Sequence, residues 1–462
     1  MRHLRSTAVT LCAALLTACA PAARRPPPAA QLEVPVEYYR LANGLKVVLS
    51  PDPAVPAVTV AMYYHIGFRL EPRARTGFAH LFEHLMFQET ANLAKGEADR
   101  LVSGNGGVSN GSTRFDFTNY FAVVPSHALE PVLWVEAERM RGLALTPESL
   151  QNQKDVVKNE VRVNVLNRPY GGFPWLDLPQ FANRNWYNAH NFYGDFADLD
   201  AATFADVRAF YDTYYVPANA VLVVAGDCDL PATRAAIARY FAPLAARPEP
   251  SRPDVAEPRQ SAERRATKAD PLAPRPALAW SYHLPERNRP EWYAFGLIDQ
   301  ILLQGEDSRL WQRLVAERGY SDAVEGGSNL LGNMFDYAGP MDWVAYLIHD
   351  PAATEATITR DFDAVVHTLQ AELVGRAELE RALIKIRSAL YDLAGSPTRF
   401  GLVDLLAAFA LFDDDPARIN RIEAEFRKVT PELIRRTARE YLRPGNRTVL
   451  AVPAGAAPEP PR

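Results

Sequence analysis

The stretch YYVPAN (Tyr214–Asn219) runs directly into the apolar residues Val221–Val224, a pattern typical of a turn that leads into a buried strand. The same arrangement returns 227 residues later, where YLRPGN (Tyr441–Asn446) runs into Val449–Val452. A period this long indicates a duplicated domain, because the repeats of a solenoid are only a few tens of residues long. Two coincidental helix-turn-strand units are the alternative.

A second pair of segments supports the duplication. Tyr64-His65 ends one expected strand and Tyr282-His283 ends another, 218 residues later, and each pair precedes a loop and an apolar helix. Because such elements pack in layers around a core, we predict an α+β fold with two similar domains. Each domain should contain a mainly antiparallel sheet covered by helices.

A change of composition marks the boundary between the two halves. Residues 247–276 contain seven prolines and many charges, which a compact interior does not accommodate. We therefore predict a first domain at 35–246, a linker at 247–276 and a second domain at 277–455. A tail at 456–462 follows.

The N-terminus is predicted to be a targeting segment. Two arginines precede the apolar stretch Thr7–Leu16, and Leu16-Thr17-Ala18-Cys19 is similar to the cleavage site of a bacterial lipoprotein. We expect a signal at 1–19, lipidation of Cys19 and an extended tether at 20–34. The mature protein would then face the periplasm and touch a membrane only through its lipid anchor. Ordinary signal cleavage without lipidation is the alternative.

Length and composition exclude several classes of protein. With 462 residues, 48% of them hydrophobic and 23% charged, the chain is too long for one ordinary core and too apolar to be disordered. Its formal charge of −5 provides no positive field for nucleic acid, so we expect no nucleic-acid partner. Three cysteines cannot build a disulfide framework in a chain of this size.

Two histidines with the spacing of metal ligands occur in His80-Leu81-Phe82-Glu83-His84. Side chains four residues apart lie on one face of a helix, so His80 and His84 can present two imidazole nitrogens to one tetrahedral Zn²⁺. Glu83 lies at the edge of that face, where it can act on a water without being a ligand. This order reverses the His-Glu-x-x-His signature and keeps its geometry. An amphipathic helix with two ordinary histidines is the alternative.

A catalytic zinc site uses a third protein ligand, and Glu160 is the candidate. It belongs to a helix that we expect to begin at the capping sequence Thr146-Pro147-Glu148. Val156, Val157 and Val161 should be buried beside it, and a carboxylate in such surroundings needs a partner. From the spacing alone, an ordinary solvated glutamate remains the simpler interpretation.

Several separate motifs resemble the pitrilysin/insulinase family of zinc peptidases. They are His80–Phe87 (HLFEHLMF), Gly106–Thr113 (GGVSNGST), Thr118–Phe121 (TNYF) and Asp155–Glu160 (DVVKNE). The resemblance extends from about Val36 to Ala454. It implies an endopeptidase for peptides or unfolded polypeptides, with one zinc per chain held by His80, His84 and Glu160. Glu83 would be the general base.

The resemblance also assigns a substrate-binding strand. Gly106–Thr113 resembles the family's edge strand, against which an extended peptide pairs through main-chain hydrogen bonds. Gly107, Ser109 and Asn110 are our candidates for substrate contacts. A simple hairpin turn at Gly104–Gly107 is compatible with that role.

Three further residues are expected around the metal ligands. Asn119 and Tyr120 either orient the ligands from behind or simply pack, and these alternatives remain open. Gln153 stands seven residues before Glu160, where the family commonly has a second glutamate. An amide keeps hydrogen bonding but loses the charge, so we expect it to tune the site rather than abolish it.

The second half departs from the family at the positions that reach the substrate. Active members usually carry an Arg and a Tyr seven residues apart, where this chain has Val315 and Asp322, and neither can stabilise an oxyanion. Arg318 and Tyr320 lie nearby with the wrong spacing. In several bacterial members of the family one chain brings the zinc and a related partner brings the pair, and this chain resembles the zinc-bearing one. The resemblance therefore implies a heterodimer, with a homodimer as the alternative. A non-catalytic structural subunit of the same fold is the competing function.

Overall fold

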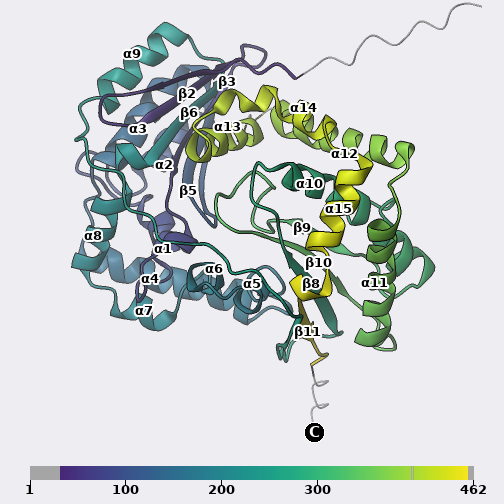
Figure 1. Cartoon of the computed structure of the whole chain (residues 1–462). Helices are drawn as coiled ribbons and strands as arrows, with labels where there is room; N and C mark the ends of the chain where they lie inside the picture. Colours follow the sequence, from purple (N-terminus) through teal and green to yellow (C-terminus); the bar gives the residue numbers. More distant parts are fainter. Residues whose placement is uncertain (1–31, 397, 399, 456–462) are drawn as a thin grey trace, which may run out of the picture. The chain divides into compact units, whose positions relative to one another are not determined.

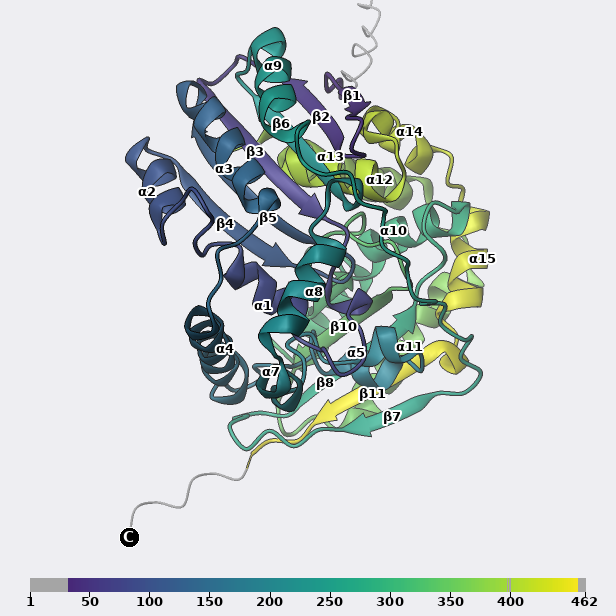
Figure 2. The ribbon, with the colours of Figure 1, turned by 90° about the vertical axis from the view of Figure 1, so that its left-hand side faces the viewer.

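The structure is a computed structural model that describes residues 32–396, 398 and 400–455 (Figure 1 and Figure 2). The described residues from Val34 onward form one compact unit. The predicted signal with Cys19, most of the predicted tether and the tail at 456–462 lie outside the described residues. None of the described helices combines the length and the apolar character needed to cross a membrane.

The first sheet has six strands in the order β1-β2-β6-β3-β5-β4. These are β1 (Glu37–Arg40), β2 (Lys46–Pro51), β3 (Ala57–Tyr64), β4 (Val108–Thr113), β5 (Thr118–Pro125) and β6 (Ala220–Gly226). All neighbouring strands are antiparallel except β2 and β6. β4 therefore lies at one edge of the sheet, as the resemblance implies for a substrate-binding strand.

The second sheet has five strands in the order β7-β11-β8-β10-β9. These are β7 (Arg264–Thr267), β8 (Ala277–His283), β9 (Glu325–Ser328), β10 (Asp342–Ile348) and β11 (Arg447–Val452). All neighbouring strands are antiparallel except β7 and β11.

The two sheets repeat each other in register. Tyr64 pairs with Ala220 in the first sheet, and their counterparts Tyr282 and Arg447 pair in the second. These counterparts are 218 and 227 residues apart, the offsets expected from the sequence. The parallel pair β2–β6 likewise corresponds to β7–β11. The predicted α+β class, with two similar and mainly antiparallel sheets covered by helices, is confirmed.

Helices cover both sheets. In the first half they are α1 (Phe78–Leu85), α2 (Glu97–Gly104), α3 (Leu129–Arg141), α4 (Pro147–Val161), α5 (Leu178–Ala182), α6 (Trp186–Ala189), α7 (Phe196–Ala201), α8 (Phe204–Tyr214) and α9 (Leu230–Phe241). In the second half they are α10 (Pro290–Leu302), α11 (Glu355–Ala371), α12 (Arg376–Gly395), α13 (Phe400–Phe412), α14 (Ile422–Arg427) and α15 (Pro431–Tyr441).

Short 3₁₀ and π segments join these elements. They are η1 (Phe68–Leu70), η2 (Ser126–Ala128), η3 (Arg162–Leu166), η4 (Pro217–Asn219), η5 (Trp311–Glu317), η6 (Pro416–Asn420) and η7 (Pro444–Asn446).

The strand β3 lies in the interior of the first sheet, and all of its residues after Ala57 are buried. The reason is that helices cover both of its faces: α3 packs on one side and α13, from the second half, packs on the other (Figure 1). A strand covered on both faces favours a continuous apolar run, which is what AVTVAMYY provides.

Each half contributes a helix to the sheet of the other. α13 packs on β2, β3 and β6, and Tyr63 Oη on β3 donates a hydrogen bond to Asp404 on α13 (2.9 Å). Conversely, α5 packs on β7, β8 and β11, and Arg264 Nη1 donates to the carbonyl oxygen of Ala182 (2.7 Å). β7 itself belongs to segment 247–276, so part of that proline-rich segment is an edge strand of the second sheet.

Two local expectations are wrong. Gly104–Gly107 is not a hairpin turn, because it joins the end of α2 to β4, and the hairpin of β4 and β5 turns at 114–117 instead. Val156 is not buried: it lies on the outer face of α4 and is 42% exposed, whereas Val157 and Val161 are buried as expected.

Candidate active site

A buried carboxylate holds the start of α1, the helix that carries the two motif histidines. Gly77 precedes the helix with φ +81°, a left-handed conformation that favours glycine. The Glu71 carboxylate accepts hydrogen bonds from the backbone N–H groups of Gly77 (2.8 Å) and Ala79 (2.6 Å). These bonds satisfy N–H groups that the first turn of a helix leaves without partners, and they fix the direction of α1.

Glu71 is fully buried, and its carboxylate meets these two donors and one histidine. Burial raises the pKa of Glu71, and His190, whose Nε2 lies 3.5 Å from Glu71 Oε2, opposes that rise.

The helix that carries Glu160 begins as the sequence predicts. Thr146 Oγ1 accepts a hydrogen bond from Ser149 N (3.0 Å), and Ser149 Oγ accepts one from Thr146 N (2.9 Å), which forms a capping box. α4 packs against α1, and the two helices lie side by side in Figure 2. The last turn of α4 thereby brings Glu160 to the histidine face of α1.

The structure brings His80, His84 and Glu160 together. His80 Nε2 lies 3.6 Å from Glu160 Oε1, and His84 Nε2 lies 3.2 Å from Glu160 Oε2. The two imidazole rings are 4.9 Å apart between centroids and nearly perpendicular, at 82°. One ligand atom from each residue lies within 4.8 Å of the others, and no second group of this kind occurs among the described residues.

The donor set and its spacing fit a zinc ion. A tetrahedral ion with bonds of about 2.0–2.1 Å separates its donor atoms by about 3.3–3.4 Å. The distances from His80 Nε2 to Glu160 Oε1 (3.6 Å) and from His84 Nε2 to Glu160 Oε2 (3.2 Å) are of this size, each to a different oxygen of the carboxylate. Two imidazole nitrogens and one carboxylate oxygen leave a fourth position open, as in catalytic sites. Hydrogen bonds from the imidazoles of His80 and His84 hold the pKa of Glu160 well below its ordinary value.

Access to the cluster is one-sided. The His80 side chain is 5% exposed, whereas that of Glu160 is 29% exposed. Tyr193 meets the His80 ring edge-on at 5.0 Å between centroids, and Phe192 lies at 5.8 Å. Burial raises the pKa of Tyr193 to about 12, so its hydroxyl stays protonated at neutral pH. A ligand would therefore approach from the Glu160 side.

Glu83 lies beside the three-residue cluster and is held by β4. Thr113 Oγ1 donates a hydrogen bond to Glu83 Oε2 (2.7 Å). A Cβ atom at Gly111, on the same strand, would lie 3.2 Å from Glu83 Cγ, so glycine leaves the space that this side chain uses. The candidate base is therefore positioned by the edge strand.

Tyr120 contacts the backbone of α1, whereas the hydrogen bond of Asn119 is to β4 and not to the metal-ligand candidates. Tyr120 Oη donates a hydrogen bond to the carbonyl oxygen of Phe82 (3.0 Å) and lies 3.1 Å from Tyr215 Oη. Asn119 Oδ1 instead accepts a hydrogen bond from Ser112 on β4 (2.5 Å). Gln153 is buried on α4, two helical turns before Glu160.

The three candidate substrate contacts lie at the beginning of β4 or just before it. Asn110 is exposed, and its Oδ1 accepts a hydrogen bond from the N–H of Gly111 (2.9 Å). Ser109 Oγ lies 3.2 Å from Asp99 Oδ1. At Gly107 a Cβ would lie 2.6 Å from the carbonyl oxygen of Val123, so packing within this chain already requires glycine there.

The corresponding helix of the second half carries no histidine. Asp299 of α10 is buried and accepts a hydrogen bond from Trp343 Nε1 (2.7 Å), and burial raises its pKa to about 6. Arg318 and Tyr320 both bind Asp361, so they are engaged within the second half.

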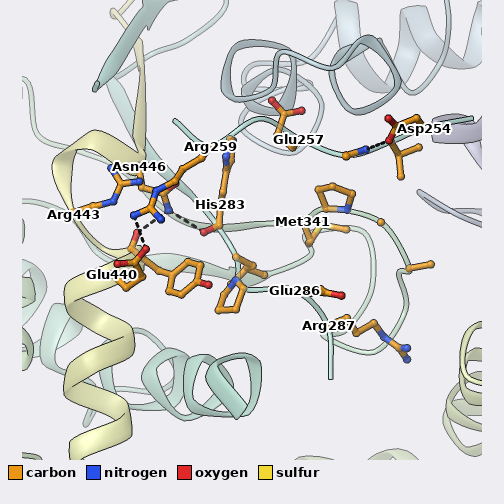
Figure 3. A pocket seen from close by; sticks show the side chains of 18 of the residues that line it. Asp254, Glu257, Arg259, His283, Glu286, Arg287, Met341, Glu440, Arg443 and Asn446 are labelled. Carbon is orange, nitrogen blue, oxygen red and sulfur yellow. Dashed lines mark hydrogen bonds and ion pairs between the residues drawn. The ribbon is translucent and has the colours of Figure 1, made fainter. Parts of the chain in front are cut away.

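A separate pocket of about 610 Å³ lies between the segment 247–276 and the second half and is not part of this site (Figure 3). None of the predicted site residues lines it. Its charges are satisfied locally: Arg259 forms an ion pair with Glu440 (2.5 Å), and Arg443 donates to the carbonyl oxygen of Gln260 (2.9 Å).

Glu71, Thr113 and Tyr193 were not predicted as individual site residues. Thr113 could have been singled out, because it closes the glycine-rich motif that resembles the edge strand. Glu71 and Tyr193 belong to no sequence motif. Their contacts with α1 arise from tertiary packing, so spacing along the chain does not predict them.

Two family models match the chain. Residues 46–169 match the model described as Insulinase (Peptidase family M16), and residues 201–386 match the one described as Peptidase M16 inactive domain. The chain belongs to the pitrilysin/insulinase family of peptidases.

Two matches cover most of both chains. The zinc protease PqqE of Helicobacter pylori is 26% identical over 419 residues, which cover 90% of this chain and 92% of PqqE. The crystal structure of a protease from Helicobacter pylori superposes with a TM-score of 0.83 at 25% identity, covering 91% of this chain and 99% of that one.

The periplasmic protease PqqL of Escherichia coli shares the fold, with a TM-score of 0.74 at 18% identity. The match covers 92% of this chain and 48% of PqqL.

Proposed function

We propose that this member of the family is the zinc-bearing subunit of an endopeptidase that hydrolyses peptides or unfolded polypeptides. The observation that carries the proposal is the approach of His80, His84 and Glu160 to within 4.8 Å of one another, with Glu83 at their side. The choice of zinc is supported by the donor set and by the name of the relative PqqE, a zinc protease.

The residues of the chain divide the work of hydrolysis. His80, His84 and Glu160 would hold one zinc ion, which supplies Lewis-acid polarisation of the peptide carbonyl and lowers the pKa of water. Glu83 would accept a proton from the attacking water and return it to the leaving amine. The buried rings of Phe192 and Tyr193 exclude bulk water from the His80 side.

The edge strand β4 would hold the substrate. An edge strand presents unpaired N–H and C=O groups, so an extended peptide can pair with β4 largely irrespective of its side chains. Gly107, Ser109 and Asn110 remain our candidates for these contacts. This mode of binding favours unfolded segments, because a folded substrate has no free strand to offer.

The partner is proposed to be a related chain. Val315 and Asp322 stand where active family members carry the Arg/Tyr pair, and Asp322 is held 3.4 Å from Arg275. A second chain that supplies an Arg and a Tyr would provide the missing donors for the oxyanion. A homodimer is the alternative assembly.

Export and lipidation at Cys19 remain part of the proposal. Support comes from the signal-like N-terminus and from the related fold of PqqL, which is named a periplasmic protease. Mass spectrometry of the mature N-terminus tests it: lipidated Cys19 is expected, and an unmodified N-terminus would contradict the anchor.

The deciding experiment is peptide cleavage by wild type and Glu83→Gln, each alone and with the related partner. Glu83→Gln keeps the size of the side chain but cannot accept the proton, so we expect cleavage to fall by about 10²–10⁴-fold with bound zinc unchanged. Glu148→Gln, at an exposed position in the first turn of α4, is the matched control and should cleave like wild type.

The competing function, a non-catalytic subunit, is favoured only by the missing Arg/Tyr pair. Metal analysis separates the two, because a structural subunit needs no stoichiometric zinc. Full cleavage by Glu83→Gln with zinc retained would refute the assigned base.

A further inference from the structure

The strand that would pair with substrate also contacts the candidate base. On β4, Val108 and Asn110 lie on one face of the strand and are exposed, whereas Gly111 and Thr113 lie on the opposite face and are buried. Thr113 is 1% exposed and closes the β4–β5 hairpin opposite Thr118. The strand also contacts α1. Its hydrogen-bonding edge opposite β5 is open, because β4 is the last strand of the sheet as the structure describes it.

The hydroxyl of Thr113 has two hydrogen-bond acceptors nearby, and the carboxylate of Glu83 is the nearer one. Its Oγ1 lies 2.7 Å from Glu83 Oε2 and 3.5 Å from the carbonyl oxygen of Ala79. A hydroxyl has a single proton, so the shorter contact to the carboxylate takes it. Because Thr113 is buried and β-branched, its χ1 angle is restricted and water does not compete for this bond.

The hydrogen bond leaves half of the carboxylate available. Among the described residues, no hydrogen bond from the protein reaches the other oxygen of Glu83, Oε1. A carboxylate held at one oxygen keeps the second in a defined place, and a base must be held within hydrogen-bond reach of the proton that it takes.

We propose that Thr113 is a positioning residue for Glu83, and that it aligns the base with a peptide bound on the same strand. This inference rests on the proposed peptidase function. β4 sets the depth of the substrate through its main chain and the orientation of Glu83 through one hydroxyl. Loss of that hydroxyl should lower kcat and leave KM unchanged, because the outer edge of the strand stays intact.

Three variants test the role of the hydroxyl. Thr113→Val keeps the shape and removes the donor, and Thr113→Ser keeps the donor. Thr118→Val is the matched control, because Thr118 occupies the same rung of the hairpin and its Oγ1 donates to the carbonyl oxygen of Ile66 (2.7 Å), not to Glu83. Both valine variants lose one buried hydrogen bond of similar length.

The expected result is a fall in kcat of about tenfold for Thr113→Val, part of the contribution of a general base, with KM within about twofold of wild type. Thr113→Ser should recover most of the rate. Thr118→Val should keep the wild-type kcat. Equal kcat in Thr113→Val and Thr118→Val, or no recovery in Thr113→Ser, would overturn the inference.

A second readout does not depend on activity. In crystal structures of the metal-free proteins, the Glu83 carboxylate should keep its place in wild type and Thr113→Ser and move in Thr113→Val. An unmoved Glu83 in Thr113→Val overturns the positioning role. If wild type cleaves no peptide with or without its partner, the proposed function fails instead, and the crystal structures still decide whether Thr113 holds Glu83.

Discussion

The two halves of the molecule contain similar sheets and differ in what lies beside the edge strand of each. In the first half, α1 and α4 bring three zinc-type ligands next to β4. In the second half, α10 and α12 follow in the same chain order, and with β9 they line a cavity of about 370 Å³. That cavity contains Asp299 and apolar side chains of α12 such as Leu390 and Leu393, and no histidine.

The fold and the chemistry are therefore specified by separate residues. Paired strands and buried apolar side chains produce the same register twice, whereas the site depends on a few side chains at positions that the fold tolerates in other forms. At the matching place in the second half, Asp299 is satisfied by Trp343, and the helix is buried instead of opening a metal site.

The largest expected effect is the loss of metal binding in the first half. Glu160→Gln removes the anionic ligand, so we expect zinc binding to weaken by more than about a hundredfold, since even residues behind a ligand affect affinity by 10–100-fold. Peptide cleavage should be lost with it. Zinc content after dialysis against a chelator is the measurement.

Asp299→Asn is the control for that experiment. It changes the buried carboxylate of the second half and should leave zinc content at the wild-type value. A parallel loss of zinc in both variants would mean that the two halves do not act separately.

The second prediction concerns stability against pH in the second half. Burial raises the pKa of Asp299 from 3.8 to about 6. A raised pKa means that the folded state binds the proton more tightly, so this stabilisation is fully present below about pH 4 and is lost as pH rises through about 6. The loss amounts to about 3 kcal/mol in the free energy of unfolding.

Urea unfolding of wild type and Asp299→Asn at pH 4 and pH 8 measures this effect. The amide cannot ionise and keeps an acceptor for Trp343, so the variant should lose less stability than wild type between the two pH values. An identical pH dependence in both proteins would contradict the assignment.

The smallest expected effect concerns stability and compares the N-terminal caps of α4 and α12. Thr146 caps α4 through Ser149, whereas Gly375 precedes α12 without a side-chain hydrogen bond. Thr146→Ala should cost about 1 kcal/mol of stability. Gly375→Ser should gain at most a few tenths of a kcal/mol, because glycine is itself tolerated at this position. Thermal unfolding of both variants decides; a loss in Gly375→Ser as large as in Thr146→Ala would contradict the capping argument.

Local patterns were sufficient for much of the fold and for part of the site. The apolar runs near Val58–His65 and Val221–Val224 are strands, and the Thr146 cap starts a helix, because these signals act over a few residues. Val156 was misjudged since burial depends on which face of α4 the core meets. Part of the proline-rich segment became β7 because β11 offered it a free edge.

The duplication, the strand-rich halves and the pair of histidines one helical turn apart follow from the amino-acid sequence, because each depends on spacing along the chain. The packing of the chain places Glu160 beside these histidines, Thr113 against Glu83 and Glu71 at the start of α1. Those contacts join residues distant in sequence, and their geometry follows from how α1, α4 and β4 pack, which no local pattern encodes.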